Sequence, residues 1–228
     1  MRILIIAEIG QNHVGNTDIA KALIYEAKAS GADIAKFQLY DSKVLYGKKQ
    51  QQELSKEQVI ELAEYCKQVD IEFMASVFDV KRIQWCEEVG VKRYKIATRS
   101  IDDYDLLQAV YSKGKQVIMS LPYGIASNCK LDDVRDRTSY LYCIPEYPTL
   151  PQKLHLGNVQ FVKGFDGFSD HSIGITAAQI AISRWAQIIE KHFRLESNPM
   201  SPDYLHSITP TQMRRLVRFA REAEIMLL

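Results

Sequence analysis

The sequence has little that would cross-link the chain or place it in a membrane. Its 228 residues include four cysteines, and these form neither a CxxC pair nor a spacing typical of disulfide frameworks (Cys66, Cys86, Cys129 and Cys143). Reduced thiols in a cytoplasm are the simplest interpretation. The apolar start is too short for a signal peptide, and no later apolar run approaches the length of a membrane span. These absences predict a soluble cytoplasmic protein.

The sequence also lacks an excess of charge of either sign. Its 29 basic and 28 acidic residues leave a net charge of +1, which excludes a general attraction to nucleic acid or to an acidic membrane. Any bound anion must therefore be held by cations placed close to it. No GxGxxG turn follows the first apolar segment, which disfavours an open dinucleotide-binding sheet.

What the chain does contain is a regular alternation of short apolar, β-branched segments and helical patterns. Strands are expected at residues 2–10, 34–39, 71–78, 93–98, 116–121 and 138–144, followed by a seventh ending at residues 168–171 and an eighth ending at 192. Helices are expected to begin at the caps Thr17, Ser55 and Asp102, after the third strand, and within residues 174–185 and 210–227. The crossover after the fifth strand has only a weak helical pattern at 131–135, and an irregular helix is expected at 154–162. Eight such units without a composition break predict a single-domain (β/α)8 TIM barrel over residues 1–228, with an open doubly wound sheet as the main rival.

Two segments near the end of this pattern organise the predicted site. One ends in Phe168-Ser169-Asp170-His171 and the other in Ile188-Ile189-Glu190-Lys191-His192-Phe193, with one helical stretch between them. If both are parallel strands, their carboxyl ends lie side by side, and His171 and His192 face each other across one cavity. A single histidine would merely close a strand, whereas two at equivalent ends favour a shared metal site.

Polar residues also end the other predicted strands. Lys36 and Gln38 share one strand face, and the apolar pattern predicts that Lys95 is buried. Because burying a lysine on a central strand costs free energy without a structural benefit, we expect these lysines to be functional. Two lysines with hydroxyls and an amide can cradle a phosphate or carboxylate. The candidate residues are Glu8, Lys36, Gln38, Ser76, Lys95, Thr98, Ser120, Tyr147, Ser169, His171, Glu190 and His192. For Ser76, Thr98, Ser120 and Tyr147 alone, an ordinary structural role is equally compatible with the sequence.

These motifs resemble the sialic acid synthase (N-acetylneuraminate synthase) family. The resemblance runs in order through Ala7-Glu8-Ile9-Gly10-Gln11-Asn12-His13, Gly31-Ala32-Asp33 with Lys36-Phe37-Gln38, Tyr94-Lys95-Ile96-Ala97, Glu146-Tyr147-Pro148, Gly167-Phe168-Ser169-Asp170-His171 and Ile188-Ile189-Glu190-Lys191-His192-Phe193. The first motif and the last two are the most specific.

The resemblance implies a transferase that condenses phosphoenolpyruvate with an N-acetylmannosamine-type sugar, an N-acylated hexosamine, to give a nine-carbon 2-keto sugar acid and phosphate. It implies a divalent metal, Mn²⁺ or Mg²⁺, bound by His171 and His192 and polarising the sugar aldehyde. Phosphoenolpyruvate would be surrounded by Lys36, Gln38, Ser76, Lys95, Thr98, Ser120 and Ser169. Glu8, Tyr147 and Asp203 would face the sugar or the water on the metal.

The sequence departs from the family pattern mainly around the sugar. Thr98-Arg99-Ser100 replaces a segment that ends in an acidic residue, Ser120-Leu121-Pro122 replaces a Ser-Thr-Gly turn, and Pro145 replaces an asparagine. Pro199-Met200-Ser201-Pro202-Asp203-Tyr204 stands where the family has Pro-Gly-Pro-Asp-His. The resemblance also covers the barrel only, whereas the family adds an antifreeze-like domain that covers the partner subunit's active site. A homodimer is therefore the family's expectation for this chain, the lid and its arginine are unaccounted for within the resemblance, and a separately encoded lid-domain protein is a candidate partner.

Two alternatives to the synthase remain open from the sequence. One is a degenerate barrel that binds phosphoenolpyruvate or metal as a subunit and needs a separate lid protein; the altered sugar loops favour it. The other is a metal-dependent aldolase or isomerase on the same fold, in which Lys36 and Lys95 would lack their anion. Retention of both lysines and both histidines favours the synthase.

Overall fold

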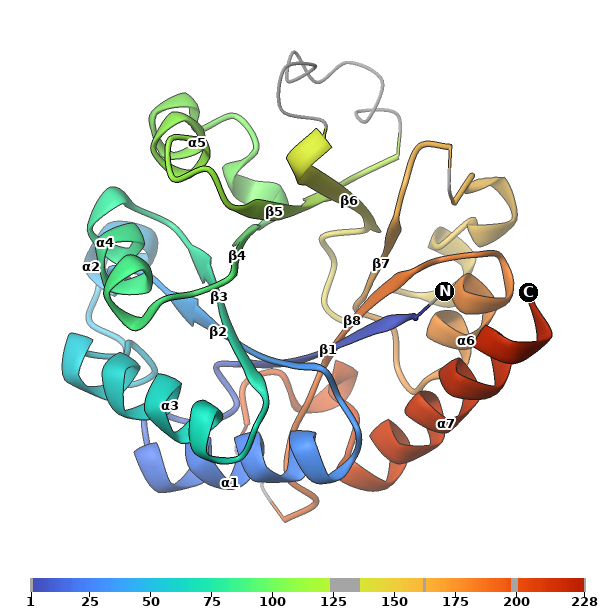
Figure 1. Cartoon of the computed structure of the whole chain (residues 1–228), viewed down its shortest axis with the longest axis horizontal. Helices are drawn as coiled ribbons and strands as arrows, with labels where there is room; N and C mark the ends of the chain where they lie inside the picture. Colours follow the sequence, from blue (N-terminus) through green and yellow to red (C-terminus); the bar gives the residue numbers. More distant parts are fainter. Residues whose placement is uncertain (1, 124–135, 162, 198–200, 228) are drawn as a thin grey trace.

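The computed structural model describes residues 2–123, 136–161, 163–197 and 201–227. Its eight parallel strands form a closed barrel in which the order along the sheet follows the order along the chain, and β1 pairs with β8 (Figure 1). The strands are β1 Leu4–Gly10, β2 Ile34–Leu39, β3 Glu72–Val77, β4 Arg93–Ile96, β5 Gln116–Leu121, β6 Thr138–Cys143, β7 Gly167–Asp170 and β8 Ile188–His192. The predicted TIM barrel is confirmed, and the open sheet is excluded.

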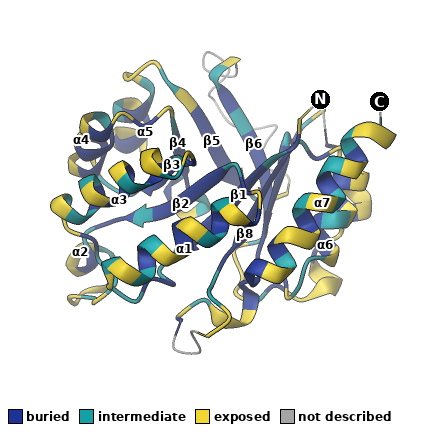
Figure 2. Cartoon of the chain, turned by 60° about the horizontal axis from the view of Figure 1, so that its bottom comes forward, coloured by how far each residue is buried: buried dark blue, intermediate teal, exposed yellow. Residues whose placement is uncertain are grey.

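Helices cover the outside of the barrel. They are α1 Thr17–Ala29, α2 Ser42–Tyr46, α3 Lys56–Gln68, α4 Val80–Val89, α5 Tyr104–Tyr111, α6 Thr176–Ser183 and α7 Pro210–Met226. Figure 2 shows buried strands inside and helices whose outer faces are exposed. Side chains that point outward from the strands pack against the inner helix faces in the larger core cluster, whereas Ile6, Ile34, Met74, Ile118, Leu141 and Ile188 form a smaller cluster of buried residues. This division is the one expected for a barrel whose interior is itself packed.

The starts of α1, α3, α5 and α7 agree with the sequence patterns to within one residue. In contrast, α6 begins two residues after the expected start, and α2 was not predicted. Ser55 caps α3 in a reciprocal capping box with Gln58, as expected. Two predicted caps are wrong by one position. The side chain of Asn16, not Thr17, accepts from the backbone N–H of Ile19, and Asp103, not Asp102, accepts from Leu106. In both cases neighbouring residues are each competent caps, so composition alone cannot choose between them.

The connections depart from regular geometry where the sequence pattern is weak. The segment predicted as one irregular helix contains one short 3₁₀ turn, η4 Leu156–Asn158, and a second, η3 Pro151–Lys153, lies just before it. β4 ends at Ile96, and Thr98 begins the 3₁₀ turn η1, so this strand is shorter than predicted. The weak helical pattern at 131–135 lies outside the described residues.

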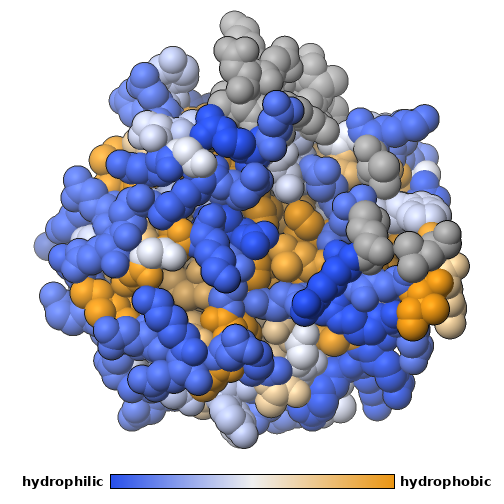
Figure 3. All heavy atoms as spheres, in the orientation of Figure 1, coloured by the Kyte–Doolittle hydropathy of each residue, from blue (hydrophilic) through white to orange (hydrophobic). Residues whose placement is uncertain are grey.

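The face of the barrel that is drawn in Figure 3 is predominantly polar. On the face drawn in Figure 3, hydrophobic residues form separate patches between hydrophilic ones. Among the described residues, no helix combines the length and the apolar character that crossing a membrane would require.

Candidate active site

One cavity of about 520 Å³ gathers the predicted site residues at the carboxyl ends of the strands. All of the side chains proposed from the sequence line it: Glu8, Lys36, Gln38, Ser76, Lys95, Thr98, Ser120, Tyr147, Ser169, His171, Glu190, His192 and Asp203. Parallel strands end together at one mouth of the barrel, which explains why residues scattered over the sequence converge. Their common location is therefore established, while their chemical roles stay predictions.

The first part of the cavity is an ion pair between β1 and β2. The Lys36 ammonium lies 2.6 Å from a carboxylate oxygen of Glu8, and both side chains are almost fully buried. Lys36 also donates to the Ser76 hydroxyl at 3.0 Å, and Gln38 donates to the second Glu8 oxygen at 2.8 Å. Because Lys36 and Gln38 are two residues apart on a strand, they share one face, as predicted.

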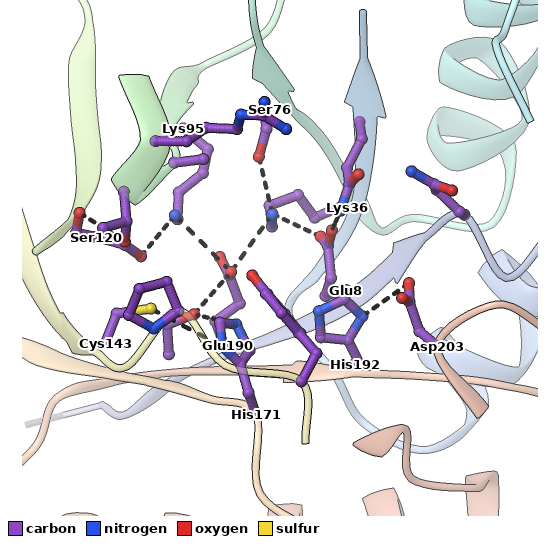
Figure 4. Close-up of a pocket in the computed structure, with 18 of the residues that line it drawn as sticks. Glu8, Lys36, Ser76, Lys95, Ser120, Cys143, His171, Glu190, His192 and Asp203 are labelled. Atoms are coloured by element: carbon purple, nitrogen blue, oxygen red, sulfur yellow. Dashed lines mark hydrogen bonds and ion pairs between the residues drawn. The ribbon is translucent and has the colours of Figure 1, made fainter. Parts of the chain in front are cut away.

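Glu190 joins this pair to the second lysine. One of its carboxylate oxygens lies 3.4 Å from the Lys36 ammonium and 3.8 Å from the Lys95 ammonium, as Figure 4 shows. The same oxygen accepts from Ser169 at 3.1 Å, and Lys95 donates to Ser120 at 2.7 Å. Glu190, from β8, thus lies between two cations contributed by β2 and β4.

Burial and charge act in opposite directions on the pKa values of this group. Burial lowers the pKa of Lys95, and the nearby Glu190 carboxylate only partly offsets it. Burial also acts to lower the pKa of Lys36, but Glu190 and Glu8 outweigh it, so this pKa is raised. Burial alone would raise the pKa of Glu190, yet the two lysines hold it at about 2. Two lysines and two acidic residues thus share this interior, and their mutual contacts offset the cost of burying them.

His171 is fixed at the opposite wall of the cavity. One ring nitrogen, Nδ1, lies 2.9 Å from the carbonyl oxygen of Ile144, which leaves Nε2 facing the cavity 3.5 Å from the Ser169 hydroxyl. The Tyr147 ring lies over the imidazole with ring centres 4.1 Å apart. Burial, together with the nearby His192, lowers the pKa of His171 well below its ordinary value. A neutral imidazole of this kind is suited to bind a metal.

His192 faces His171, with ring centres 5.6 Å apart, as the strand ends predicted. Its Nδ1 lies 3.2 Å from a carboxylate oxygen of Asp203. The other Asp203 oxygen lies 3.5 Å from Nε2 of His206, in the 3₁₀ turn η5 Tyr204–His206. Within the described residues, His192, Asp203 and His206 form a group whose donor atoms are close enough to hold one metal ion. The sequence predicted the pair His171 and His192, and His171 is outside this group.

A second buried ion pair supports both histidines from behind. Asp170 and Lys191 directly precede His171 and His192, are fully buried, and lie 3.1 Å apart. Because side chains alternate along a strand, this pair points away from the cavity. Lys191 also donates to the carbonyl of Ser172, and Asp170 accepts from the backbone N–H of Ser172 at 2.8 Å. The ends of β7 and β8 are thereby joined just behind the imidazoles.

Several cavity residues were not singled out from the sequence. Cys143, Arg99 and Gln11 line the cavity, and His206 contacts it through Tyr147, with ring centres 5.2 Å apart. Arg99 and Gln11 lie beside recognised motifs and could have been found from that position. His206 follows an irregular loop with no strand pattern, so only its spacing of three residues from Asp203 could have indicated it.

Comparisons with known proteins agree with this geometry. The NeuB family profile matches residues 43–227. The chain is 33% identical to the N,N'-diacetyllegionaminic acid synthase of Legionella pneumophila, covering 100% of this chain and 74% of that protein. It is 30% identical to the human N-acetylneuraminate-9-phosphate synthase, covering 96% and 70%.

Solved structures show the same relationship. The crystal structure of the sialic acid synthetase from Leptospira borgpetersenii, in complex with citrate, superimposes with a TM-score of 0.93 at 30% identity and covers 100% of this chain and 85% of that one. A family profile that spans most of the barrel, together with relatives of this identity and coverage, decides the assignment. The chain belongs to the NeuB family.

Proposed function

We propose that this chain condenses phosphoenolpyruvate with an N-acylated hexosamine of the N-acetylmannosamine type, giving a nonulosonic 2-keto sugar acid and phosphate. The observation that carries the proposal is the convergence of Lys36 and Lys95 in one buried cavity beside His171 and His192. Family relatives named as synthases of N,N'-diacetyllegionaminic acid and N-acetylneuraminate 9-phosphate support this reaction type.

The two lysines are assigned to the phosphate and carboxylate of phosphoenolpyruvate. Ser76 and Ser120 already accept from these amines, and Ser169 lies across Glu190 from them, so hydroxyls surround the position of the anion. Preorganised cations of this kind stabilise the charge that develops in the transition state without having to reorganise. Gln38 and Thr98 complete the cradle in this proposal.

The reaction balances without a redox partner. Carbon 3 of phosphoenolpyruvate attacks the aldehyde carbon of the open-chain sugar, forming the new C–C bond, and the aldehyde oxygen takes a proton. Water adds at carbon 2, and phosphate leaves as its C–O bond breaks, giving the ketone. We assign to Glu8, a buried carboxylate in the same cavity, the acceptance of the proton from this water. Tyr147 and Asp203 are assigned to the sugar or to the water on the metal.

The charge of the cavity indicates why a divalent cation is needed. The positive charges of Lys36 and Lys95 are already balanced by Glu8 and Glu190. If the lysines alone received a multiply charged anion, its negative charge would therefore not be neutralised. We propose that His171 and His192 hold Mn²⁺ or Mg²⁺. The Nε2 atom of His171 faces the cavity, and the buried Nδ1 atom of His192, which has no hydrogen-bond partner among the described residues, lies beside the Asp203 carboxylate, so both imidazoles fit such an ion. Such a metal, when bound, would polarise the aldehyde of the sugar.

We also propose that the protein is cytoplasmic. Cys66, Cys86 and Cys143 are free and buried, as expected for a cytoplasmic protein. A homodimer and a separate lid protein follow from the family resemblance alone.

Phosphate release tests the proposal directly. We expect release from phosphoenolpyruvate only when Mn²⁺ and an acceptor are both present, with a panel that includes N-acetylmannosamine, its 6-phosphate and a diacetamido hexose. A chelator should stop release, and added Mn²⁺ should restore it. Tight binding of phosphoenolpyruvate without release by any acceptor would instead favour a degenerate binding subunit, and sugar cleavage independent of phosphoenolpyruvate would favour an aldolase.

A further inference from the structure

We propose that His206 and Asp203 are metal ligands in this protein, beside His192, and that they give the site a preference for transition metals over Mg²⁺. The inference deepens the proposed function, because it concerns the metal of the same cavity. It rests on three side chains that come together from β8 and from the loop that follows it.

The donor atoms of these residues are already gathered without an ion. His192 Nδ1 and His206 Nε2 flank the Asp203 carboxylate at 3.2 and 3.5 Å, and the two imidazole rings lie with their centres 4.5 Å apart. All of the donor atoms lie within 4.8 Å of one another. Separations of this size suit ligands around a single cation, since nitrogen and oxygen ligands bind at about 2.0–2.2 Å from the metal.

The same atoms lack other partners. His192 and His206 are both more than nine-tenths buried, and among the described residues their facing nitrogens and one Asp203 oxygen have no hydrogen-bond partner. Buried polar atoms are rarely left unsatisfied, because each costs about 1–3 kcal/mol. A cation bound between these two nitrogens and the Asp203 oxygen would satisfy all three atoms.

The loop that carries Asp203 and His206 is held rigidly in place. The Asn12 side chain, from the end of β1, donates to the Phe193 carbonyl at 2.8 Å and to the Ser207 hydroxyl at 2.9 Å. Its own oxygen accepts from Ser201 and from the backbone N–H of Asp203. The backbone N–H of Ile208 donates to the carbonyl of His192 at 2.8 Å, so the loop returns to the strand. Preorganisation of this kind is expected for metal ligands.

The donor set also indicates the class of metal. With the proposed ligands His171 and His192, the addition of His206 and Asp203 gives three imidazole nitrogens and one carboxylate oxygen. This set leaves positions open for substrate and favours first-row transition metals such as Mn²⁺, Fe²⁺ or Co²⁺. Mg²⁺ prefers an all-oxygen shell with several waters. A single pair of histidines with water would discriminate less strongly between transition metals and Mg²⁺. His206 is therefore the residue that sets the preference for transition metals.

Metal binding to the apoprotein tests this assignment without any turnover. Co²⁺ and Mg²⁺ affinities are measured by calorimetry, and the visible absorption of bound Co²⁺ reports on its ligands. We expect His206→Ala to weaken Co²⁺ binding at least about tenfold, to change the Co²⁺ spectrum and to lower the ratio of Co²⁺ to Mg²⁺ affinity. His206→Gln, which preserves more of the side-chain volume, should do the same if His206→Ala melts early.

The controls separate this inference from the proposed function. His155→Ala removes an exposed histidine outside the cavity and should leave metal binding unchanged. In wild-type protein with ¹⁵N-labelled histidine, Zn²⁺ should shift the His206 ring signal. Unchanged Co²⁺ affinity and spectrum in the His206 variants, or an unshifted His206 signal, would overturn the inference, although phosphate release by the wild type would still uphold the proposed function.

Discussion

At the scale of single residues, the site is defined by charges that are buried in pairs. Lys36, Lys95, Glu8 and Glu190 would each be costly to bury alone, and their mutual contacts are what make burial tolerable. Replacing one residue of such a group leaves its charged partner buried and unpaired in the low-dielectric interior. Effects of substitution should therefore be large and specific to the position.

Lys95→Met tests the proposed anion cradle. The substitution removes one of the two buried ammonium groups but preserves most of the side-chain volume, so we expect phosphoenolpyruvate-dependent phosphate release to fall about 10³-fold. Lys92→Met, which changes an exposed lysine just before β4, is the matched control and should retain activity. Phosphate release by Lys95→Met within about twofold of wild type would contradict the assigned role.

We expect the buried residue His13, which lies outside the proposed metal site, to make the stability of the fold depend on pH. Burial lowers the pKa of His13 to about 4, from an ordinary value of 6.5, and its Nδ1 accepts from the backbone N–H of Gly15 at 3.1 Å. Above pH 6.5 the residue is neutral in both states. As the pH falls from 6.5 to about 4, the unfolded chain gains a proton that the folded chain refuses, so stability decreases by an amount on the order of 3 kcal/mol.

Urea unfolding between pH 7 and pH 4 measures this effect. Wild type should lose more unfolding free energy over the range than His13→Gln, whose amide can still accept the Gly15 hydrogen bond. Because other groups also titrate here, the relevant quantity is the difference between the two proteins. Parallel curves would show that His13 does not carry the dependence.

At the scale of elements, the ends of β7 and β8 act as one unit. The Asp170–Lys191 pair joins the two strands on the outer side, while His171 and His192 face the cavity from the same strand ends. The ion pair therefore fixes the relative positions of the two histidine-bearing ends. Its role is structural support and not contact with substrate.

Lys191→Met should destabilise the fold because it leaves the Asp170 carboxylate buried without its cation. We expect a loss of about 3–5 kcal/mol in unfolding free energy, with partial recovery when Asp170→Asn is added. Lys153→Met breaks the exposed pair with Glu146 and should cost no more than about 1 kcal/mol. Similar losses from the two lysine substitutions would show that burial of the pair is unimportant.

The elements were predictable where periodicity is strong. Every strand was anticipated, because eight apolar segments of barrel length alternate with helical patterns. The caps of α1 and α5 were misplaced by one residue, since Asn16 and Thr17, or Asp102 and Asp103, offer equivalent oxygens to the helix start. The site residues on strands were found for the same reason as the strands. His206 was not, because a 3₁₀ turn after β8 brings it back to the cavity and no periodic signal marks that turn.

At the scale of the whole molecule, the barrel brings together two groups of site residues that lie in separate parts of the chain. The lysines come from β2 and β4 and the histidines from the ends of β7 and β8, and the cavity exists because the sheet is closed. Sequence could predict this convergence once the fold was assigned, since the carboxyl ends of all strands meet at one mouth. It could not predict that Glu190 would bridge both lysines, which depends on side-chain reach across the interior.

The pairing of β1 with β8 also bears on when during biosynthesis the pocket can exist. Glu8 is opposite His192 in the register of this pair, and the backbone N–H of Phe193 donates to the Glu8 carbonyl. Within this chain, β1 is therefore synthesised well before β8, the strand that covers its outer edge. A nascent chain halted before residue 188 would hold both amines and His171 but would lack Glu190 and His192, so ligand capture should begin only after the eighth strand has emerged.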